Sequence, residues 1–297
     1  MRNIPTTVAE QIFSAVSTPF YVVCVLLEMI ISNWQKKTYY TTRDTTTNLI
    51  LTSLNLGLDL LFRAGYIAIL VWFYNRSIFT IENKILYWVA LVIIEDFAYF
   101  LLHVCDHYCR LFWAVHVTHH SSNLFNLTTG IRSSVFEPLY RFIFFIPIAF
   151  LGFQPMDIVL IYSITQMYGA LIHTKYFKSW GILDYILVTP SHHRVHHGSN
   201  PEYLDKNMGM LLIIWDRMFG TFQKELDNVE IKFGLTKDIE DKSIVNTITH
   251  EWRAIIHDLK QQIPFKAKLK YLLFPPGWSH DGSRKTSNQI REELGIK

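Results

Sequence analysis

Hydrophobic residues gather in long runs in the first third of the chain and in shorter runs afterwards. Three of the early runs reach the roughly 20 residues that a helix needs to cross a membrane. They cover residues 12–32, 49–74 and 85–104. The pattern therefore predicts three spanning helices before residue 110.

Two further apolar runs, 139–151 and 156–172, are each short for a full span and are separated by Gly152 and Pro155. They predict a helical hairpin or one kinked pair of helices. The fold class expected is an all-α integral membrane protein, a bundle of about four spanning helices or helical hairpins with a cytoplasmic helical cap.

A few charged residues lie inside the apolar runs, where they are costly unless paired or facing a protein interior. Asp59 and Arg63 are four residues apart, so we interpret them as an ion pair across one helical turn rather than as a substrate contact. Glu95 and Asp96 leave two alternatives open: one of them orients a histidine, or both are satisfied within the bundle.

The second half of the chain has shorter apolar runs, more charges and more prolines. Residues 182–188 and 208–222 are too short to span, so we expect them at the membrane surface or against the spanning helices. The last 75 residues are polar, with a helix expected at about 241–262. Two parts are therefore predicted: a membrane domain, 12–222, and a polar, partly helical C-terminal tail, 223–297.

Composition and charge narrow the class of protein. Half of the 297 residues are hydrophobic and 15% are aromatic, which is typical of a membrane protein, and the net charge of +3 does not indicate a nucleic-acid partner. Three cysteines cannot form a disulfide framework. The loop at 33–48 carries one more positive charge than the loop at 75–84, which favours a multi-pass arrangement with the first loop and the histidines in the cytoplasm.

Histidines form the most unusual pattern in the sequence. Ten of the 13 lie between His103 and His197, most of them in clusters with helical spacing. The ten are His103, His107, His116, His119, His120, His173, His192, His193, His196 and His197.

Imidazole at this spacing is a typical ligand of iron, copper and zinc. Eight to ten imidazoles exceed what one tetrahedral zinc ion uses, so the pattern predicts two metal ions with positions left open for dioxygen or water. A metalloprotease is disfavoured because no cluster has the H-E-x-x-H pattern, and a transporter because the clusters lie at helix ends. His173 is expected to be a ligand, and His192 either a ligand or a support.

The three clusters also resemble a known family. HVCDH at 103–107, HVTHH at 116–120 and HRVHH at 193–197 are similar to the histidine boxes of the membrane fatty acid hydroxylase/sterol desaturase superfamily. Within it, the stretch 189–222, with the later FGLT and PPGW segments, resembles the alkylglycerol monooxygenase group and its bacterial members.

The resemblance implies a membrane-bound, di-iron monooxygenase of lipid metabolism that uses O2 to hydroxylate a C–H bond of a lipid. In this group the reacting carbon is the ether-linked carbon of alkylglycerols, and the animal enzyme uses tetrahydrobiopterin. One alternative is a desaturase or hydroxylase of sterols, fatty acids or carotenoids with a redox-protein electron donor. Outside the enzymes, the alternative is a non-catalytic metal-binding membrane protein.

The site residues follow by position. The resemblance implies eight iron ligands: His103, His107, His116, His119, His120, His193, His196 and His197. His173 is expected as a ninth ligand because it stands at the end of the apolar hairpin, where it would lie near the others.

Supporting residues are expected around the ligands. Candidates to orient imidazoles by hydrogen bonds lie on both sides of the last box. His192 precedes the box, and Asp205 and Asn207 follow it. Asn123 and Asn126, directly after the second box, are candidate substrate contacts at a pocket mouth.

Overall fold

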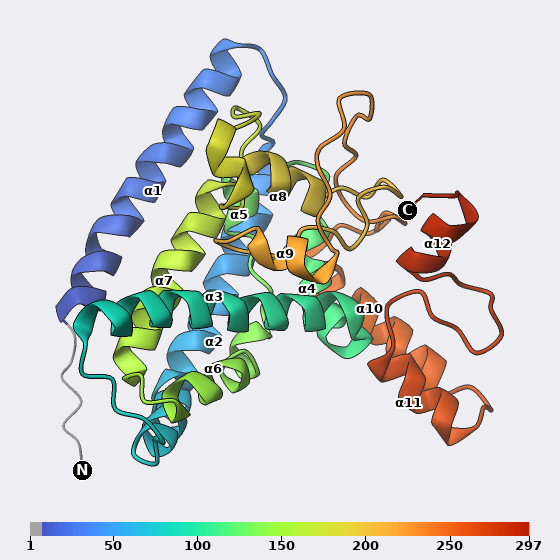
Figure 1. The fold of residues 1–297 in the computed structure, drawn as a ribbon. Coiled ribbons are helices and arrows are strands. Elements are labelled where there is room, and N and C mark those ends of the chain that lie inside the picture. Colours follow the sequence, from blue (N-terminus) through green and yellow to red (C-terminus); the bar gives the residue numbers. More distant parts are fainter. Residues whose placement is uncertain (1–7, 297) are drawn as a thin grey trace.

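Residues 8–296 are described by a computed structural model, and within them the chain is helical with only two isolated β-bridges. Figure 1 shows α1 on one side of the molecule and the C-terminal helices on the other, with α3 running across between them. The elements are α1 Val8–Trp34, α2 Thr42–Tyr74, α3 Lys84–Tyr108, α4 Arg110–His120, α5 Leu127–Gly130, η1 Glu137–Leu139, α6 Phe142–Phe150, α7 Pro155–Leu171, η2 Gly181–Tyr185, α8 Pro190–His196, α9 Ile214–Phe219, α10 Ile244–Leu259, α11 Phe265–Leu273 and α12 Ser287–Glu293.

Helices α1, α2 and α3 are long and apolar enough to cross a membrane, which confirms the three early helices as candidate spans. Each extends beyond its apolar run because polar residues continue the helix. Thr41 caps α2 by accepting a hydrogen bond from the backbone of Asp44, and Asn83 caps α3 in the same way. At the other end, α3 continues through His107, so the first histidine pair lies on a regular helix.

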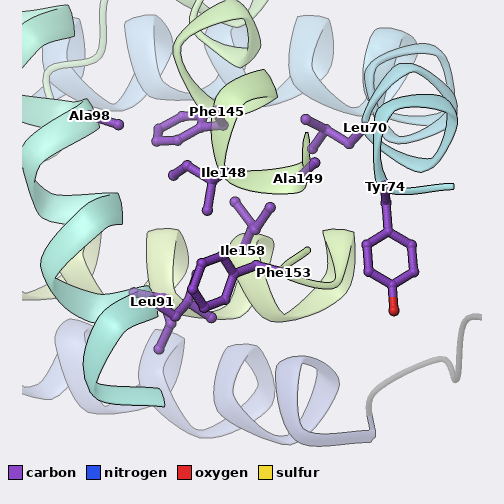
Figure 2. Close-up of a cluster of buried hydrophobic side chains, with 10 residues drawn as sticks. Leu70, Tyr74, Leu91, Ala98, Phe145, Ile148, Ala149, Phe153 and Ile158 are labelled. Carbon is purple, nitrogen blue, oxygen red and sulfur yellow. The ribbon is translucent and has the colours of Figure 1, made fainter. Parts of the chain in front are cut away.

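Helices α6 and α7 form the predicted hairpin, and the chain turns at Gly152 with a φ of 109°. The hairpin packs on α2 and α3 through an apolar cluster that Figure 2 shows in close-up. Leu91 of α3, Ile148 of α6 and Ile158 of α7 are buried there to 1% exposure or less. This packing fixes α7, and with it the loop that carries His173.

Polar residues inside the helices tie the bundle together. The predicted ion pair is confirmed, with Arg63 Nη2 at 2.6 Å from Asp59, and Arg141 near the start of α6 binds the same carboxylate. On α1, the buried Glu28 accepts hydrogen bonds from Leu127 N (2.8 Å) and Thr174 Oγ1 (2.5 Å). The carboxylate of Glu28 therefore holds two loops beside α1.

Hydrogen bonds separate the two alternatives for Glu95 and Asp96. Asp96 is satisfied within the bundle, because it accepts hydrogen bonds from the backbone of Leu211 and Leu212 and from Trp215 Nε1, at 2.8–3.1 Å. Glu95 accepts one from Thr165 Oγ1 at 3.3 Å, and its Oε2 has no hydrogen-bond partner among the described residues. Within residues 8–296 no hydrogen bond joins either carboxylate to a histidine, so neither orients an imidazole.

The short apolar runs 182–188 and 208–222 are helical only in part. The first contains most of η2, and the second contains α9. Phe219 of α9 stacks on Phe97 and Phe100 of α3, so this run lies against a candidate spanning helix. The helix expected at 241–262 is α10, which packs against α4.

We expect Gly130→Ala to destabilise the fold by roughly 1–3 kcal/mol, the usual cost of overpacking. An added Cβ would lie 2.5 Å from the backbone oxygen of Ala170, and a backbone atom cannot move aside as a flexible side chain can. Thermal unfolding in detergent measures the loss. Gly57→Ala is the matched control because a Cβ there meets nothing within 4 Å. Equal unfolding temperatures for the two variants would contradict the prediction.

Candidate metal centre

Five buried histidines from three helices form a first group, in which one ring nitrogen of each lies within 4.8 Å of the others. Helices α3, α4 and α8 contribute to it. The members are His103, His107, His116, His120 and His196.

Four more histidines form a second group with the same spacing of nitrogen atoms. His119 comes from α4, His173 follows the end of α7, and the α8 segment supplies His193 and His197. The two groups are adjacent, since the rings of His120 and His197 stack with centroids 4.4 Å apart. All nine histidines predicted as ligands are therefore brought together.

Each H-x-x-H-H box is divided between the two groups. On α4, His116 and His120 are four residues apart and lie on one face, while His119 is rotated toward the second group. The α8 segment reverses this division, because His193 and His197 belong to the second group and His196 to the first. One helical turn can in this way contribute to two metal sites.

Backbone carbonyls fix the orientation of four rings. In each case Nδ1 lies at hydrogen-bond distance from a carbonyl oxygen, which can only accept, so Nδ1 carries the proton. The pairs are His103 with Met208 (2.7 Å), His119 with Arg132 (2.9 Å), His173 with Gly169 (2.7 Å) and His196 with Lys206 (3.1 Å).

With the proton on Nδ1, a neutral ring has only a lone pair at Nε2. These lone pairs face one another inside the groups. Nε2 of His173 lies 2.9 Å from Nε2 of His193 and 3.0 Å from that of His197, although one lone pair can accept only one hydrogen bond. Nε2 of His107 is buried with no hydrogen-bond partner among the described residues. Such an arrangement is unfavourable without a cation.

Burial favours the neutral form of three of the rings, those of His119, His196 and His197. Burial lowers the pKa of His119 to about 4, and burial together with the neighbouring histidines lowers the pKa of His196 and His197 well below the usual value. Neutral imidazoles with converging lone pairs are suited to bind a transition-metal ion. The residues present therefore fit a pair of metal ions, one in each group.

Two aspartates stand behind the first group. Asp205 Oδ1 lies 3.1 Å from Nδ1 of His107, within hydrogen-bond distance, and its supporting role stays a prediction. Asp106 lies 3.6 Å from Nδ1 of His116 and accepts a hydrogen bond from Tyr140 at 2.6 Å. The sequence reasoning missed Asp106, although its place inside the first box, HVCDH, was a signal that could have found it.

The segment after the last box has an unusual backbone. Asp205 and Asn207 adopt φ values of 52° and 55°, a region that aspartate and asparagine tolerate better than most residues. The fully buried Asn207 side chain donates to the carbonyl oxygens of His192 and Gln223, so it braces this segment. His192 lies outside both groups, and its Nδ1 accepts a hydrogen bond from the backbone of Thr189.

The two candidate substrate contacts lie in different surroundings. Asn123 is exposed and donates to Asp238 at 2.9 Å. Asn126 is buried, caps α5 with its carbonyl oxygen and donates to the carbonyl of Tyr39 at 2.6 Å. Asp216 accepts from the backbone of Met208 and Gly209, so it positions the carbonyl that orients His103.

We expect Asp205→Gly to lower metal affinity roughly 10–100-fold, the usual effect of removing a carboxylate that orients a ligand. Glycine tolerates the positive φ, so the change removes the carboxylate without backbone strain. Metal titration of the purified protein measures the effect. Asp205→Asn keeps an acceptor for His107 and should retain most of the affinity, and Asp227→Gly, at an exposed turn, should change nothing. A loss of equal size in the Asp227 variant would refute this role.

The helices, the candidate spans and the buried histidines together indicate a membrane protein with a candidate metal centre. Residues 88–221 match the family model described as fatty acid hydroxylase. The matched stretch contains all nine clustered histidines. The family resemblance read from the histidine boxes is confirmed.

Comparison with individual proteins gives more specific similarities than the family model does. The chain is 35% identical over 285 residues to alkylglycerol monooxygenase of Xenopus tropicalis, covering 94% of this chain and 61% of the relative. It is 33% identical to the human alkylglycerol monooxygenase, covering 94% and 62%. An ornithine lipid hydroxylase of Rhizobium tropici is 31% identical over 148 residues, 49% of this chain and 44% of that protein.

The chain thus spans about three fifths of the length of the alkylglycerol monooxygenases it matches. No solved structure is matched.

Proposed function

We propose that the protein is a multi-pass membrane oxygenase with two iron ions, which uses O2 to hydroxylate a C–H bond of a lipid. The observation that carries this proposal is the pair of adjacent histidine groups with converging lone pairs inside the stretch that matches the fatty acid hydroxylase model. Three helices able to span a membrane support a substrate drawn from the lipid phase. In this proposal residues 12–222 are the catalytic domain and residues 223–297 a peripheral tail.

The nine clustered histidines would hold the ions, five in one group and four in the other. Bound iron would supply the activation of O2 and the oxidation of the C–H bond. One oxygen atom enters the lipid as a hydroxyl and the other leaves as water, so an external donor must deliver two electrons and two protons. The backbone carbonyls, with Asp205, keep the imidazoles oriented and so preorganise the site, while Asp106 lies 3.6 Å behind His116.

The names of the relatives favour one substrate class. We infer that the reacting carbon is the ether-linked carbon of an alkylglycerol, and that tetrahydrobiopterin is the electron donor. A sterol, fatty acid or carotenoid substrate with a redox-protein donor is the alternative that the experiment below separates.

The cytoplasmic side is proposed from charge. Tyr39 accepts a hydrogen bond from Asn126, which keeps the loop carrying Lys36 and Lys37 near the second histidine box. Positive loops stay in the cytoplasm, so this contact supports a cytoplasmic position for the metal centre.

The test is to purify the protein from cells grown with iron and to measure its metal content and O2 consumption. We expect about two iron ions per chain and O2 consumption that depends on both an alkylglycerol and tetrahydrobiopterin. Consumption with a sterol or fatty acid and a ferredoxin system instead would establish the alternative. A protein that binds zinc alone and consumes no O2 would contradict the oxygenase proposal.

A further inference from the structure

A small cavity adjoins both histidine groups. It has a volume of about 90 Å³ and lies between α2, α3, α7 and the segment that follows α5. On one side it is lined by members of both groups, and on the other by Asn55, Ser134, Glu137, Tyr162 and Gln166. A substrate carbon that reacts at the metal centre would have to lie here.

Two buried polar atoms facing this cavity lack hydrogen-bond partners among the described residues: Ser134 Oγ and Gln166 Nε2. Ser134 is only 1% exposed. The side chain of Gln166 also approaches the buried Tyr99 hydroxyl as a hydrogen-bond neighbour, so Ser134 Oγ is the atom that most clearly lacks a partner. Leaving such groups unpaired destabilises a protein, so unpaired groups that share one cavity indicate a polar ligand.

The cavity is also lined by charged residues of both signs, Glu137, Arg132 and Arg141. Arg141 is ion-paired with Asp59, and burial raises the pKa of the Glu137 carboxyl, which opposes a negative charge there. A hydroxyl group could donate to Glu137 and accept from Gln166 or Ser134.

We propose that Gln166 and Ser134 are specificity-determining residues that hydrogen-bond an uncharged, hydroxyl-bearing part of the lipid beside the reacting carbon. The inference rests on the proposed hydroxylase function and assigns substrate recognition to named residues. Gln166 shares one face of α7 with Tyr162, Gly169 and Ala170, so the recognition site and the loop of His173 are positioned by the same helix.

The test measures binding without turnover. Iron-loaded protein is kept free of O2, and radiolabelled 1-O-hexadecylglycerol is displaced either by the unlabelled diol or by its 2,3-di-O-methyl analogue. We expect the diol to bind at least about tenfold more tightly, since a site built for hydroxyls discriminates against their loss. In Gln166→Met and Ser134→Ala, the ratio of the affinity for the diol to the affinity for its dimethyl analogue should fall toward one, because only the diol loses hydrogen bonds.

Matched controls come from the same helix. Ser163→Ala removes a hydroxyl that bonds to Val159 within α7, and Gln154→Met changes the residue that precedes α7; neither residue lines the cavity. Both should keep the wild-type ratio. Equal binding of diol and dimethyl analogue by the wild type, or an equal loss for both probes in the cavity variants, would overturn the inference.

The two proposals fail in different ways. Selective diol binding by a protein that never consumes O2 would refute the hydroxylase function and leave the recognition site standing. Lipid-dependent O2 consumption with a diol-to-dimethyl ratio that the variants do not change would refute the recognition site alone.

Discussion

Replacing His120 or His193 by alanine should remove one of two metal ions and abolish turnover. His120 belongs to the first group and His193 to the second, so each single variant should retain about one iron ion per chain and the double variant none. Loss of one ligand also leaves the remaining lone pairs of that group without the cation that they require. Metal analysis and O2 consumption on the same preparations measure both effects.

A histidine outside the groups serves as the control. The His257 side chain is 82% exposed on α10, and His257→Ala should keep both iron ions and full activity. Two results would contradict the two-site arrangement. One is loss of both ions in either single variant, which would indicate a single shared site. The other is full iron content and full activity in both single variants.

The sequence predicted the candidate spanning helices and the histidines that the fold brings together, because both leave a periodic signal; that these histidines bind iron stays a prediction. Apolar runs of spanning length gave α1, α2 and α3, and spacings of three and four residues gave the histidine boxes. The assignment of His173 came only from its position at a helix end. Its Nε2 now lies within 3.0 Å of those of His193 and His197.

Other features of the site could not be predicted because they depend on tertiary packing. The division of each box between two groups follows from how α4 faces α8, which spacing alone does not reveal. The acceptors that orient the rings are mainly backbone carbonyls, such as those of Met208 and Lys206, and a carbonyl has no sequence signature. Asp96 and Asp216 both act by binding backbone amides rather than imidazoles, for the same reason.

The second large effect is expected at Arg110, the first residue of α4, which joins this helix to the C-terminal part of the chain. Its buried guanidinium lies 2.6 Å from Glu251 and 2.6 Å from Asp258, both on α10. Arg110→Met would leave two carboxylates short of their partner, which costs about 3–5 kcal/mol when a buried pair is broken. We expect a large fall in the unfolding temperature and weaker metal retention, because α4 carries three of the nine histidines.

The control for Arg110→Met is another cation in the same region. Lys285 pairs with Glu293 at 2.5 Å, but both side chains are about half exposed, so Lys285→Met should cost less than about 1 kcal/mol. Thermal unfolding of both variants in detergent, followed with metal content, makes the comparison. Equal stability of the two variants would show that the Arg110 network does not hold α10 on α4.

The Arg110 network also has an expected pH dependence. Burial alone would raise the pKa of Asp258, but hydrogen bonds and positive charge from Arg110 and Arg284 lower it below its usual value. A carboxyl with a lowered pKa in the folded state contributes its stability above the unfolded pKa, near 3.9, and loses it as the pH falls through the folded pKa. The stability difference between wild type and Arg110→Met should therefore be constant from pH 7 to about 5 and shrink below about 4. If the stability difference between wild type and Arg110→Met stays constant down to pH 3, the ion pair between Arg110 and Asp258 does not cause that difference.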